Sequence, residues 1–521
     1  MRILDPIAAN EPRAAFAEAA YSPRLAARSL FAPELALTGA FIAMVWLLVF
    51  FGGPSALFRD ADAGWHIRAG ERMIAAGTLP QGDPFSFSKA GEAWIAWEWA
   101  SDVLVGTAHR AAGLSGVAFL YMLAIATAVW MWFRLNWAAG GNFVLACLFA
   151  APMLTTTNLH WLARPHVFGW LFALGTVWFC EKAAGRKPAP HVLAGVFALS
   201  ALWANMHGSF FMGPAIIGIY IAGAWLGKVL WGRSMRSAAL LPACGAALAG
   251  TFLNPHGWNL HRHVFAYLTD SALLDRIGEF QSFNFHAEGA TQITLALLIG
   301  AAGGFAALTA HRFDRFLLSM IVTAAALRSA RMLPVAVLIL LPLANGSIST
   351  VLTNAELAPR LRGMLDGVLD YGLRLRALDR TLNGAALVPF AALALFGVTH
   401  ALRPAFPADQ FPVAASNAVA ALPSNARVFS SDKFGGYLIY RFAGERKVFF
   451  DGRSDFYGAD FLARYARVVQ VRPGWQAEFA RGRFTHALVP PDFSLVPALK
   501  AQGWTELYRD RTAVLLGGPK T

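Results

Sequence analysis

The chain has 521 residues, of which 56% are hydrophobic and only 14% are charged. A soluble globular chain has roughly 25% charged residues, so this composition excludes a soluble multidomain enzyme, a disordered chain and a collagen-like repeat. The formal net charge of +13 comes without a dense block of Lys and Arg, and membrane proteins concentrate these residues in cytoplasmic loops. We therefore expect an integral membrane protein, surrounded by membrane lipids, that binds no nucleic acid.

The N-terminal segment, residues 1–34, contains four Arg and no apolar run. It lacks the pattern of a cleavable signal peptide, so we expect a cytoplasmic segment. A spanning helix needs about 20 apolar residues. The sequence contains eleven candidate spans. Two of them lie within 188–227, where Asn205, His207 and Gly208 interrupt the apolar sequence. The others are 35–53, 110–134, 135–163, 165–180, 237–253, 291–310, 315–330, 332–349 and 383–402. The three cysteines lie in or beside these runs, which argues against disulfides and Cys-ligated metal.

The basic residues indicate the orientation. With the N-terminus in the cytoplasm, the inside loops hold 18 Lys and Arg, whereas the outside loops before residue 403 hold ten over a similar length. This bias agrees with the positive-inside rule. We expect residues 35–402 to form the transmembrane domain, and an odd number of spans then places the tail, residues 405–521, outside.

Three segments are too polar for lipid: the loop 54–112, the loop 254–290 and the tail. The tail has ordinary soluble composition and reads as a small α/β domain. Short runs bounded by turn signals predict strands at 426–430, 437–440, 447–450 and 485–490, with a turn at Gly435 and Gly436. A helix over 493–503 and a hairpin over 505–516 complete a mixed sheet with covering helices.

Asp60 and Asp62 lie in the first outer loop, where the spacing predicts a helix from Asp62 onward. Asp62 and His66 are four residues apart and share a face of that helix. Asp62 is a candidate catalytic carboxylate, or only the N-cap of the helix. Two acids one residue apart are also a candidate site for a divalent cation such as Mg²⁺ or Mn²⁺.

Several cationic groups lie at the ends of the predicted spans. Arg328 and Arg331 have apolar sequence on both sides, and paired arginines suit a phosphate group; the alternative is a plain re-entrant turn with interfacial arginines. Arg164 and His166 follow the third span, as an anion site or as interfacial side chains. His207 lies in a turn at membrane depth, where a structural role is the alternative.

The tail contains a second polar cluster, in which Asp451, Arg453 and Tyr457 follow a predicted strand. It is either a loop that contacts carbohydrate or an Asp-Gly turn with an internal Asp–Arg pair.

Together these segments resemble the GT-C class of polytopic membrane glycosyltransferases. The resemblance rests on Asp62, His66, Arg68 and a Gly fifteen residues after Asp62, at Gly77. Further motifs are Asp83-Pro84-Phe85-Ser86, the tryptophans from Trp94 to Trp99, Arg164-Pro165-His166, Asn254-Pro255-His256-Gly257, Glu279-Phe280 and the tail run 451–458. They cover nearly the whole chain and are similar to bacterial GT-C-like proteins of unassigned substrate.

The resemblance implies an α-helical polytopic enzyme of the bacterial inner membrane with a periplasmic C-terminal domain. Such enzymes transfer a sugar, with inversion, from a polyprenyl-phosphate donor to a glycan, lipid or protein acceptor. Asp62 would be the general base, with Asp60 as its substitute. Arg328 and Arg331, then His207, Arg164 and His166, would bind the donor phosphate. Substrate contacts would come from His66, Trp65, Asn205, Glu279, Asp451, Arg453 and Tyr457.

One position departs from the pattern, because Ala63 stands where many of those enzymes have a second acid. The choice of base and the need for a metal therefore stay open. Two other functions remain as alternatives. One is a transporter of lipid-linked substrates, although no paired halves are visible. The other is a non-catalytic scaffold for polysaccharide assembly.

Overall fold

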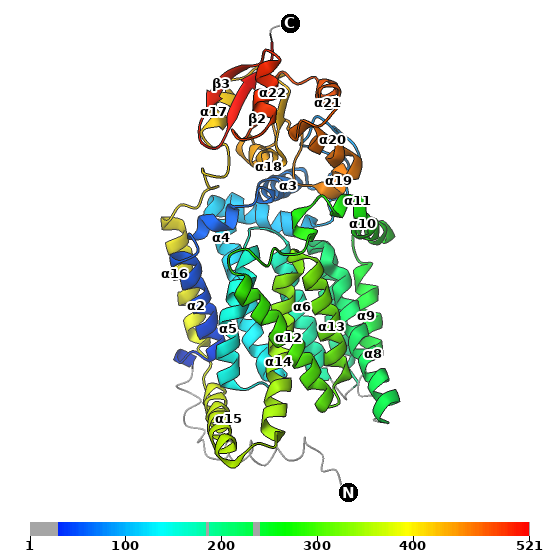
Figure 1. Ribbon diagram of the computed structural model, residues 1–521, viewed down its shortest axis with the longest axis vertical. Coiled ribbons are helices and arrows are strands. Elements are labelled where there is room, and N and C mark those ends of the chain that lie inside the picture. Colours follow the sequence, from blue (N-terminus) through cyan, green and yellow to red (C-terminus); the bar gives the residue numbers. More distant parts are fainter. Residues whose placement is uncertain (1–29, 184–186, 233–239, 520–521) are drawn as a thin grey trace.

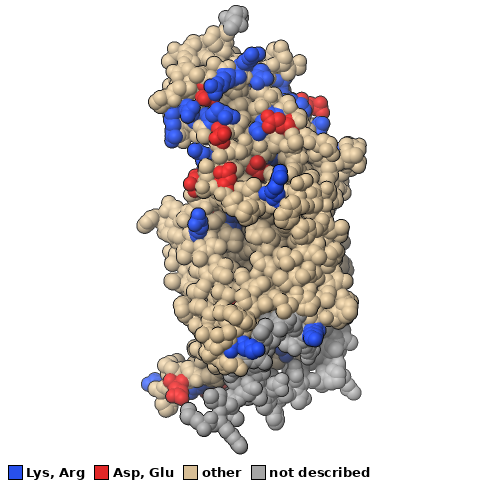
Figure 2. All heavy atoms as spheres, turned by 90° about the vertical axis from the view of Figure 1, so that its right-hand side faces the viewer, with Lys and Arg blue, Asp and Glu red and all other residues tan. Residues whose placement is uncertain are grey.

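The computed structural model describes residues 30–183, 187–232 and 240–519. Residues 1–29, most of the predicted cytoplasmic segment, lie outside the described residues. A bundle of long helices forms one part of the molecule, and a small unit with a four-stranded sheet lies beyond one end of it (Figure 1). On the face drawn in Figure 2, a broad band over the bundle shows almost no charged side chains, whereas Lys, Arg, Asp and Glu gather over the small unit. That distribution is the one expected of a chain that crosses a bilayer.

A helix is present at each of the eleven predicted positions. These helices are α2 (Leu35–Val49), α4 (Trp99–Ala138), α5 (Phe143–Thr157), α6 (His166–Ala183), α7 (Pro190–Met206), α8 (Met212–Trp231), α9 (Leu241–Thr251), α12 (Ala290–Thr309), α13 (Phe313–Arg328), α14 (Leu333–Asn354) and α16 (Val388–Ala401). Within the described ranges, five segments are long and apolar enough to cross a membrane: Trp99–Ala138, Phe143–His160, Gly208–Trp231, Ala290–Thr309 and Ala330–Asn354. The chain is therefore a multi-pass membrane protein, and the number eleven stays a prediction.

The turn predicted near residue 207 is confirmed. Helix α7 ends at Met206, His207 has extended backbone, and the short helix η4 (Gly208–Phe211) leads into α8.

Helix α4 is sharply kinked, because Ala112 and Gly113 leave the helical conformation and Gly113 has a φ of 58°. Figure 1 shows that the first part of α4 lies across the end of the bundle. This part packs against α3 (Asp62–Ala76).

The remaining helices before the first strand are mostly short connections; α15, with 21 residues, is the longest, and α17 belongs to the tail. They are η2 (Pro54–Phe58), η3 (Asn158–His160), α10 (Trp258–Thr269), α11 (Ser271–Leu274), η6 (Gly278–Phe280), η7 (Ala330–Met332), α15 (Pro359–Asp379), η8 (Ala385–Leu387) and α17 (Ala415–Ala420). Buried ion pairs join the last turn of α6 to the start of α13. At the end far from the sheet, Arg315 binds Glu181 with an Nη2–Oε2 distance of 2.6 Å, and Arg312 binds the same carboxylate.

The tail forms a mixed sheet, as predicted. Strands β1 (Val428–Ser430), β2 (His486–Val489), β3 (Thr505–Arg509) and β4 (Val514–Gly517) lie in the order β1-β2-β4-β3. β1 and β2 are parallel, and the other two pairs are antiparallel. The helices of this unit are α18 (Asp432–Arg441), α19 (Ser454–Tyr457), α20 (Ala459–Val469), α21 (Trp475–Arg481) and α22 (Leu495–Ala501).

Two predicted strands of the tail are wrong. Residues 437–440 belong to helix α18, which begins where the Ser431 hydroxyl accepts a hydrogen bond from the backbone N–H of Phe434. Such a cap favours a helix over the β-propensity of the apolar run. Residues 447–450 form no strand of the sheet, and Val448 makes only an isolated bridge to Ser86 of the first outer loop. The tail and that loop are therefore joined through their backbones.

Candidate active site

Asp62 is the first residue of α3, but it does not cap the helix. Ala61 occupies the N-cap position, and the backbone N–H of Asp62 donates to Asp60 Oδ1 over 2.8 Å. The predicted capping role of Asp62 is therefore wrong, because Asp60 satisfies the backbone instead. The Asp62 carboxylate is buried and free for an interaction outside its own helix.

Arg164 provides that interaction. Its Nη2 atom lies 3.0 Å from Asp62 Oδ2, and its Nη1 atom lies 2.9 Å from Asp60 Oδ2. The same Nη1 atom is 2.5 Å from Glu279 Oε1. One guanidinium thus joins the first outer loop to the segments that follow α5 and α11. Sequence reasoning had assigned Arg164 to a phosphate, whereas the structure places it among carboxylates.

These contacts belong to a network of polar side chains, the charged network, which continues from Glu279 to Arg331. Glu279 Oε2 lies 3.4 Å from Arg331 Nη1, and Arg331 Nη2 lies 3.4 Å from His207 Nε2. His207 Nε2 is in turn 3.5 Å from Glu98 Oε1. Arg331 is therefore engaged by protein groups. Its predicted partner Arg328 is exposed and makes no ion pair or side-chain hydrogen bond with the described part of the chain.

The other end of the charged network is buried beneath α3. Glu98 Oε2 lies 3.8 Å from His66 Nε2, and His66 Nδ1 lies 2.6 Å from Asp102 Oδ1. His66 was expected to face Asp62 but is held by Asp102 instead. Glu98 and Asp102 are functional candidates that sequence reasoning missed. A signal was present, since the two acids are four residues apart at the start of α4 and share a helix face.

Burial changes the protonation of these groups. It raises the pKa of Asp62 to about 7 against the opposing charge of Arg164, and the carboxylates of Asp60 and Glu279 raise it further. Burial likewise raises the pKa of Glu98 to about 7, although Arg331 and Arg164 oppose it. Burial lowers the pKa of His66, so its ring is neutral at pH 7. Burial also opposes the ionisation of Glu279, but Arg164 and Arg331 hold its pKa below the ordinary value.

Two further predicted residues support the site. The Trp65 ring is buried and lies over the His66 ring, with centroids 3.5 Å apart. Asn205 Oδ1 accepts a hydrogen bond from Trp99 Nε1 over 2.7 Å, which ties the end of α7 to the start of α4. His166 is buried, and its Nε2 atom is bonded to the His160 carbonyl oxygen over 2.9 Å. It therefore contacts backbone and none of the carboxylates described above.

The side chains of the tail cluster are buried and form hydrogen bonds and ion pairs with one another. Arg453 Nη2 lies 2.7 Å from Asp451 Oδ2 and 2.8 Å from Asp83 Oδ1, and the Tyr457 hydroxyl donates to Asp451 Oδ2 over 2.9 Å. This arrangement is the internal Asp–Arg pair, extended to the first outer loop. The backbone of Gly452 packs against Asp62, since a Cβ atom there would be 1.9 Å from Asp62 Oδ1. The tail is thus a wall of the site.

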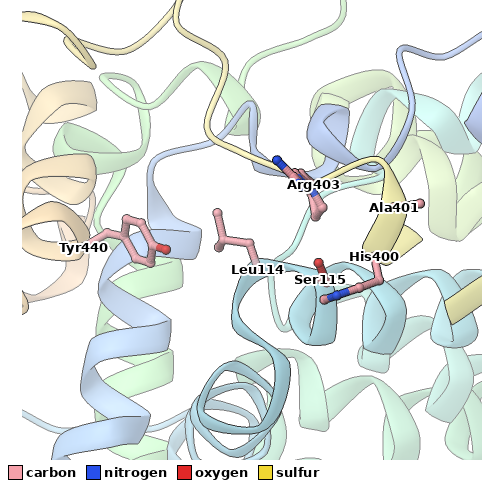
Figure 3. Close-up of a pocket in the computed structure, with 7 residues that line it drawn as sticks. Leu114, Ser115, His400, Ala401, Arg403 and Tyr440 are labelled. Atoms are coloured by element: carbon pink, nitrogen blue, oxygen red, sulfur yellow. The ribbon is translucent and has the colours of Figure 1, made fainter. Parts of the chain in front are cut away.

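A separate hollow of about 620 Å³ lies beside the kink of α4 and the end of α16. Leu114, Ser115, His400, Arg403 and Tyr440 line it (Figure 3). None of the carboxylates or cations of the charged network lines this hollow. The hollow is therefore distinct from the candidate active site.

Comparison with solved structures supports the fold. The chain is similar to the archaeal oligosaccharyltransferase AglB from Archaeoglobus fulgidus, solved in complex with an inhibitory peptide and a dolichol-phosphate, with 13% identity and a TM-score of 0.55. That match covers 87% of this chain and 69% of AglB. The apo form of the Archaeoglobus enzyme matches over the same shares with 12% identity and a TM-score of 0.51.

ArnT from Cupriavidus metallidurans, bound to undecaprenyl phosphate, has 15% identity and a TM-score of 0.49 over 93% of this chain and 98% of ArnT. No protein-family model matches the sequence, and no curated protein matches it either. The similarity to AglB shows that the chain has the GT-C fold that its motifs resembled.

Proposed function

We propose that this protein is a membrane glycosyltransferase that moves a sugar from a polyprenyl-phosphate carrier to a hydroxyl acceptor. Asp62 is the general base, and the acceptor oxygen attacks the anomeric carbon with inversion while the carrier phosphate leaves. The observation that carries the proposal is a buried carboxylate with a pKa of about 7 at the start of α3, within the GT-C fold. A general base is most effective when its pKa lies near the working pH.

The donor phosphate is proposed to bind next to the charged network, at the end of α13. Arg328 is exposed there, and its guanidinium is available for a charge-assisted bond to a phosphate. Arg331, three residues further along the chain in η7, contributes a second positive charge while it remains paired with Glu279. Together they stabilise the negative charge that develops on the leaving phosphate.

The proposed topology places this chemistry on the outer face of a bacterial inner membrane. The N-terminus is cytoplasmic, and the unit formed by residues 405–519 lies outside, where Gly452 lines the base. The excess of basic residues in the inside loops supports this orientation. The acceptor is a glycan, a lipid or a protein of the cell envelope.

The test follows release of polyprenyl phosphate by purified protein in nanodiscs. A panel of polyprenyl-phosphate sugars serves as donors, and a membrane extract supplies acceptors. The Asp62→Asn variant keeps the shape of the side chain and removes its basicity, so release should fall about 10²–10⁴-fold. Glu92→Gln is the matched control, since Glu92 is an exposed acid of the same loop, and it should release at the wild-type rate.

Equal release by wild type and Asp62→Asn would contradict the role of Asp62 and favour Asp60. No release with any donor and acceptor would contradict the transferase and favour the scaffold or transporter.

A further inference from the structure

Three carboxylates from two segments converge on one arginine. Asp60 and Asp62 precede and begin α3, and Glu279 lies in η6, yet each gives one oxygen to the Arg164 guanidinium within 3.0 Å. Arg164 is itself largely buried, and the surrounding carboxylates raise its pKa against the effect of burial. The cluster therefore has one fixed cation at its centre.

Such a cluster would otherwise need a metal ion or protons. Buried carboxylates repel one another, and proteins relieve that repulsion with a metal, a proton or a basic side chain. Oxygen ligands of this kind suit divalent cations such as Mg²⁺ and Mn²⁺. Here the nitrogen atoms of Arg164 occupy the point where the three carboxylates meet. Within the described residues, no group of three or more His, Cys, Asp and Glu side chains is arranged to hold a metal.

We propose that Arg164 is a built-in cation that takes the place of a divalent metal in this site, so that transfer proceeds without an added metal ion. The catalytic part of this inference rests on the proposed transferase function. The metal-binding part does not, because it concerns only the three carboxylates and the guanidinium. The pair Asp60 and Asp62, which the sequence offers as a cation site, already forms ion pairs with a side chain of the protein.

Arginine suits this position for two reasons. Its planar guanidinium is always charged and has five N–H donors, so a single side chain can bind several carboxylates at once. It also carries one charge rather than two, and its ion pair with Asp62 is made at Oδ2. Asp62 can therefore still accept a proton at its other oxygen, whereas a carboxylate bound to a divalent cation is a much weaker base. Arg164 acts through Asp62 and is a positioning residue.

The test measures Mn²⁺ binding to the purified full-length protein by electron paramagnetic resonance. Wild type should bind no Mn²⁺ at this site. Arg164→Ala removes the cation that the three carboxylates share and should gain one equivalent of Mn²⁺ per chain. The double variant Arg164→Ala/Glu279→Gln should lose that equivalent, and Arg164→Lys, which keeps the charge, should remain without metal.

Two results would overturn the inference. One is a stoichiometric Mn²⁺ site in wild type that Glu279→Gln removes, a measurement that stands even if Arg164→Ala does not fold. The other is a folded Arg164→Ala variant that binds no Mn²⁺.

A transfer assay supplies the independent arm. Wild-type activity should be unchanged after dialysis against EDTA, and activity that EDTA abolishes and Mn²⁺ restores would also overturn the inference. The Mn²⁺ titrations decide the matter even if no donor is turned over, so failure of the transferase proposal is distinguishable from failure of this one.

Discussion

Asp62 and Glu98 are both buried carboxyl groups with a pKa of about 7, but their neighbours differ. Asp62 forms an ion pair with Arg164 and faces the tail at Gly452. Glu98 lies between the rings of His66 and His207 at 3.5 Å or more. At the scale of single residues, pH dependence and mutation together separate their roles.

The first prediction concerns the pH profile of kcat/KM. Asp62 must be deprotonated to accept a proton, so kcat/KM should fall as the pH drops below about 7 and approach a tenfold loss per pH unit. The raised pKa of Asp62 sets that midpoint. The profile of release rates from pH 5 to 9 measures it. Glu98→Gln should keep the same acid limb. A limb that disappears in an active Glu98→Gln variant would assign the titration to Glu98.

A second residue-scale prediction concerns the donor phosphate. Arg328 is exposed, and its charge makes no ion pair with the described residues. A hydrogen bond to a charged group contributes about 1.5–3 kcal/mol, so Arg328→Gln should raise the KM for the polyprenyl-phosphate donor roughly tenfold or more. Steady-state kinetics with varied donor measures this change. Arg276→Gln, at an exposed arginine of the loop 254–290, should leave KM as it is. An equal rise in both variants would indicate general electrostatic attraction.

The sequence indicated the residue types of the site but not their pairing. Asp62 was identifiable from its loop and its spacing to Gly77, because both features are local. Its partner Arg164 is 102 residues away in sequence, and only the packing of α3 against the segment before α6 brings them together. The same holds for Arg453 and Asp83. Pairing across such distances depends on tertiary structure, which one sequence does not reveal.

At the scale of elements, helices α3 and α18 pack at unusually close range. A Cβ atom on Gly436 would lie 2.5 Å from the Ala61 carbonyl oxygen, and one on Gly64 would lie 2.2 Å from the Gly436 carbonyl oxygen. Only glycine on both helices permits this approach. The contact fixes the start of α3, where Asp62 lies.

The third prediction follows from this contact. Gly436→Ala adds a methyl group where none fits, so it should destabilise the protein by roughly 1–3 kcal/mol and lower transfer by displacing Ala61. The apparent unfolding temperature and the release assay measure both effects. The control is Gly367→Ala in α15, where nothing lies within 4 Å of an added Cβ. That change should be neutral or stabilising by up to about 1 kcal/mol. Similar behaviour of the two variants would disprove the close contact.

The same helix shows why some elements were predicted and others were not. The bundle helices were predictable because long apolar runs have few alternatives in a membrane. The run 437–440 is short and rich in Tyr and Ile, so it indicated a strand. In the structure Ser431 caps it as a helix, and glycines 435 and 436 become its packing face rather than a turn. Short segments follow tertiary context more than their own propensity.

At the scale of the whole molecule, the tail and the first outer loop are one structural unit above the bundle. The backbone bridge between Ser86 and Val448 joins them. Arg453 joins them a second time, since its buried guanidinium binds both Asp451 of the tail and Asp83 of the loop. The carboxylate of Asp83 also accepts from the backbone N–H groups of Phe85 and Ser86. Because Gly452 touches Asp62, this joint positions the base.

The last prediction tests that joint. Arg453→Met keeps the bulk among the rings of Trp94 and Phe456 but leaves two buried carboxylates without a cation, which costs about 3–5 kcal/mol. The unfolding temperature should fall, limited proteolysis should separate the tail more readily, and transfer should decrease. Adding Asp451→Asn should restore part of the stability, because it removes one of the two unpaired charges.

Arg481→Met is the matched control, since the Arg481 side chain is 71% exposed and, among the described residues, pairs with Glu478 alone. An exposed pair contributes about 0–1 kcal/mol, so this variant should resemble wild type in all three assays. If Arg453→Met keeps its stability but loses transfer, Arg453 contacts substrate directly, and the sequence-based view of a carbohydrate-binding loop is the better one. If it loses both together and Asp451→Asn restores both together, the tail acts on Asp62 through the architecture of the joint.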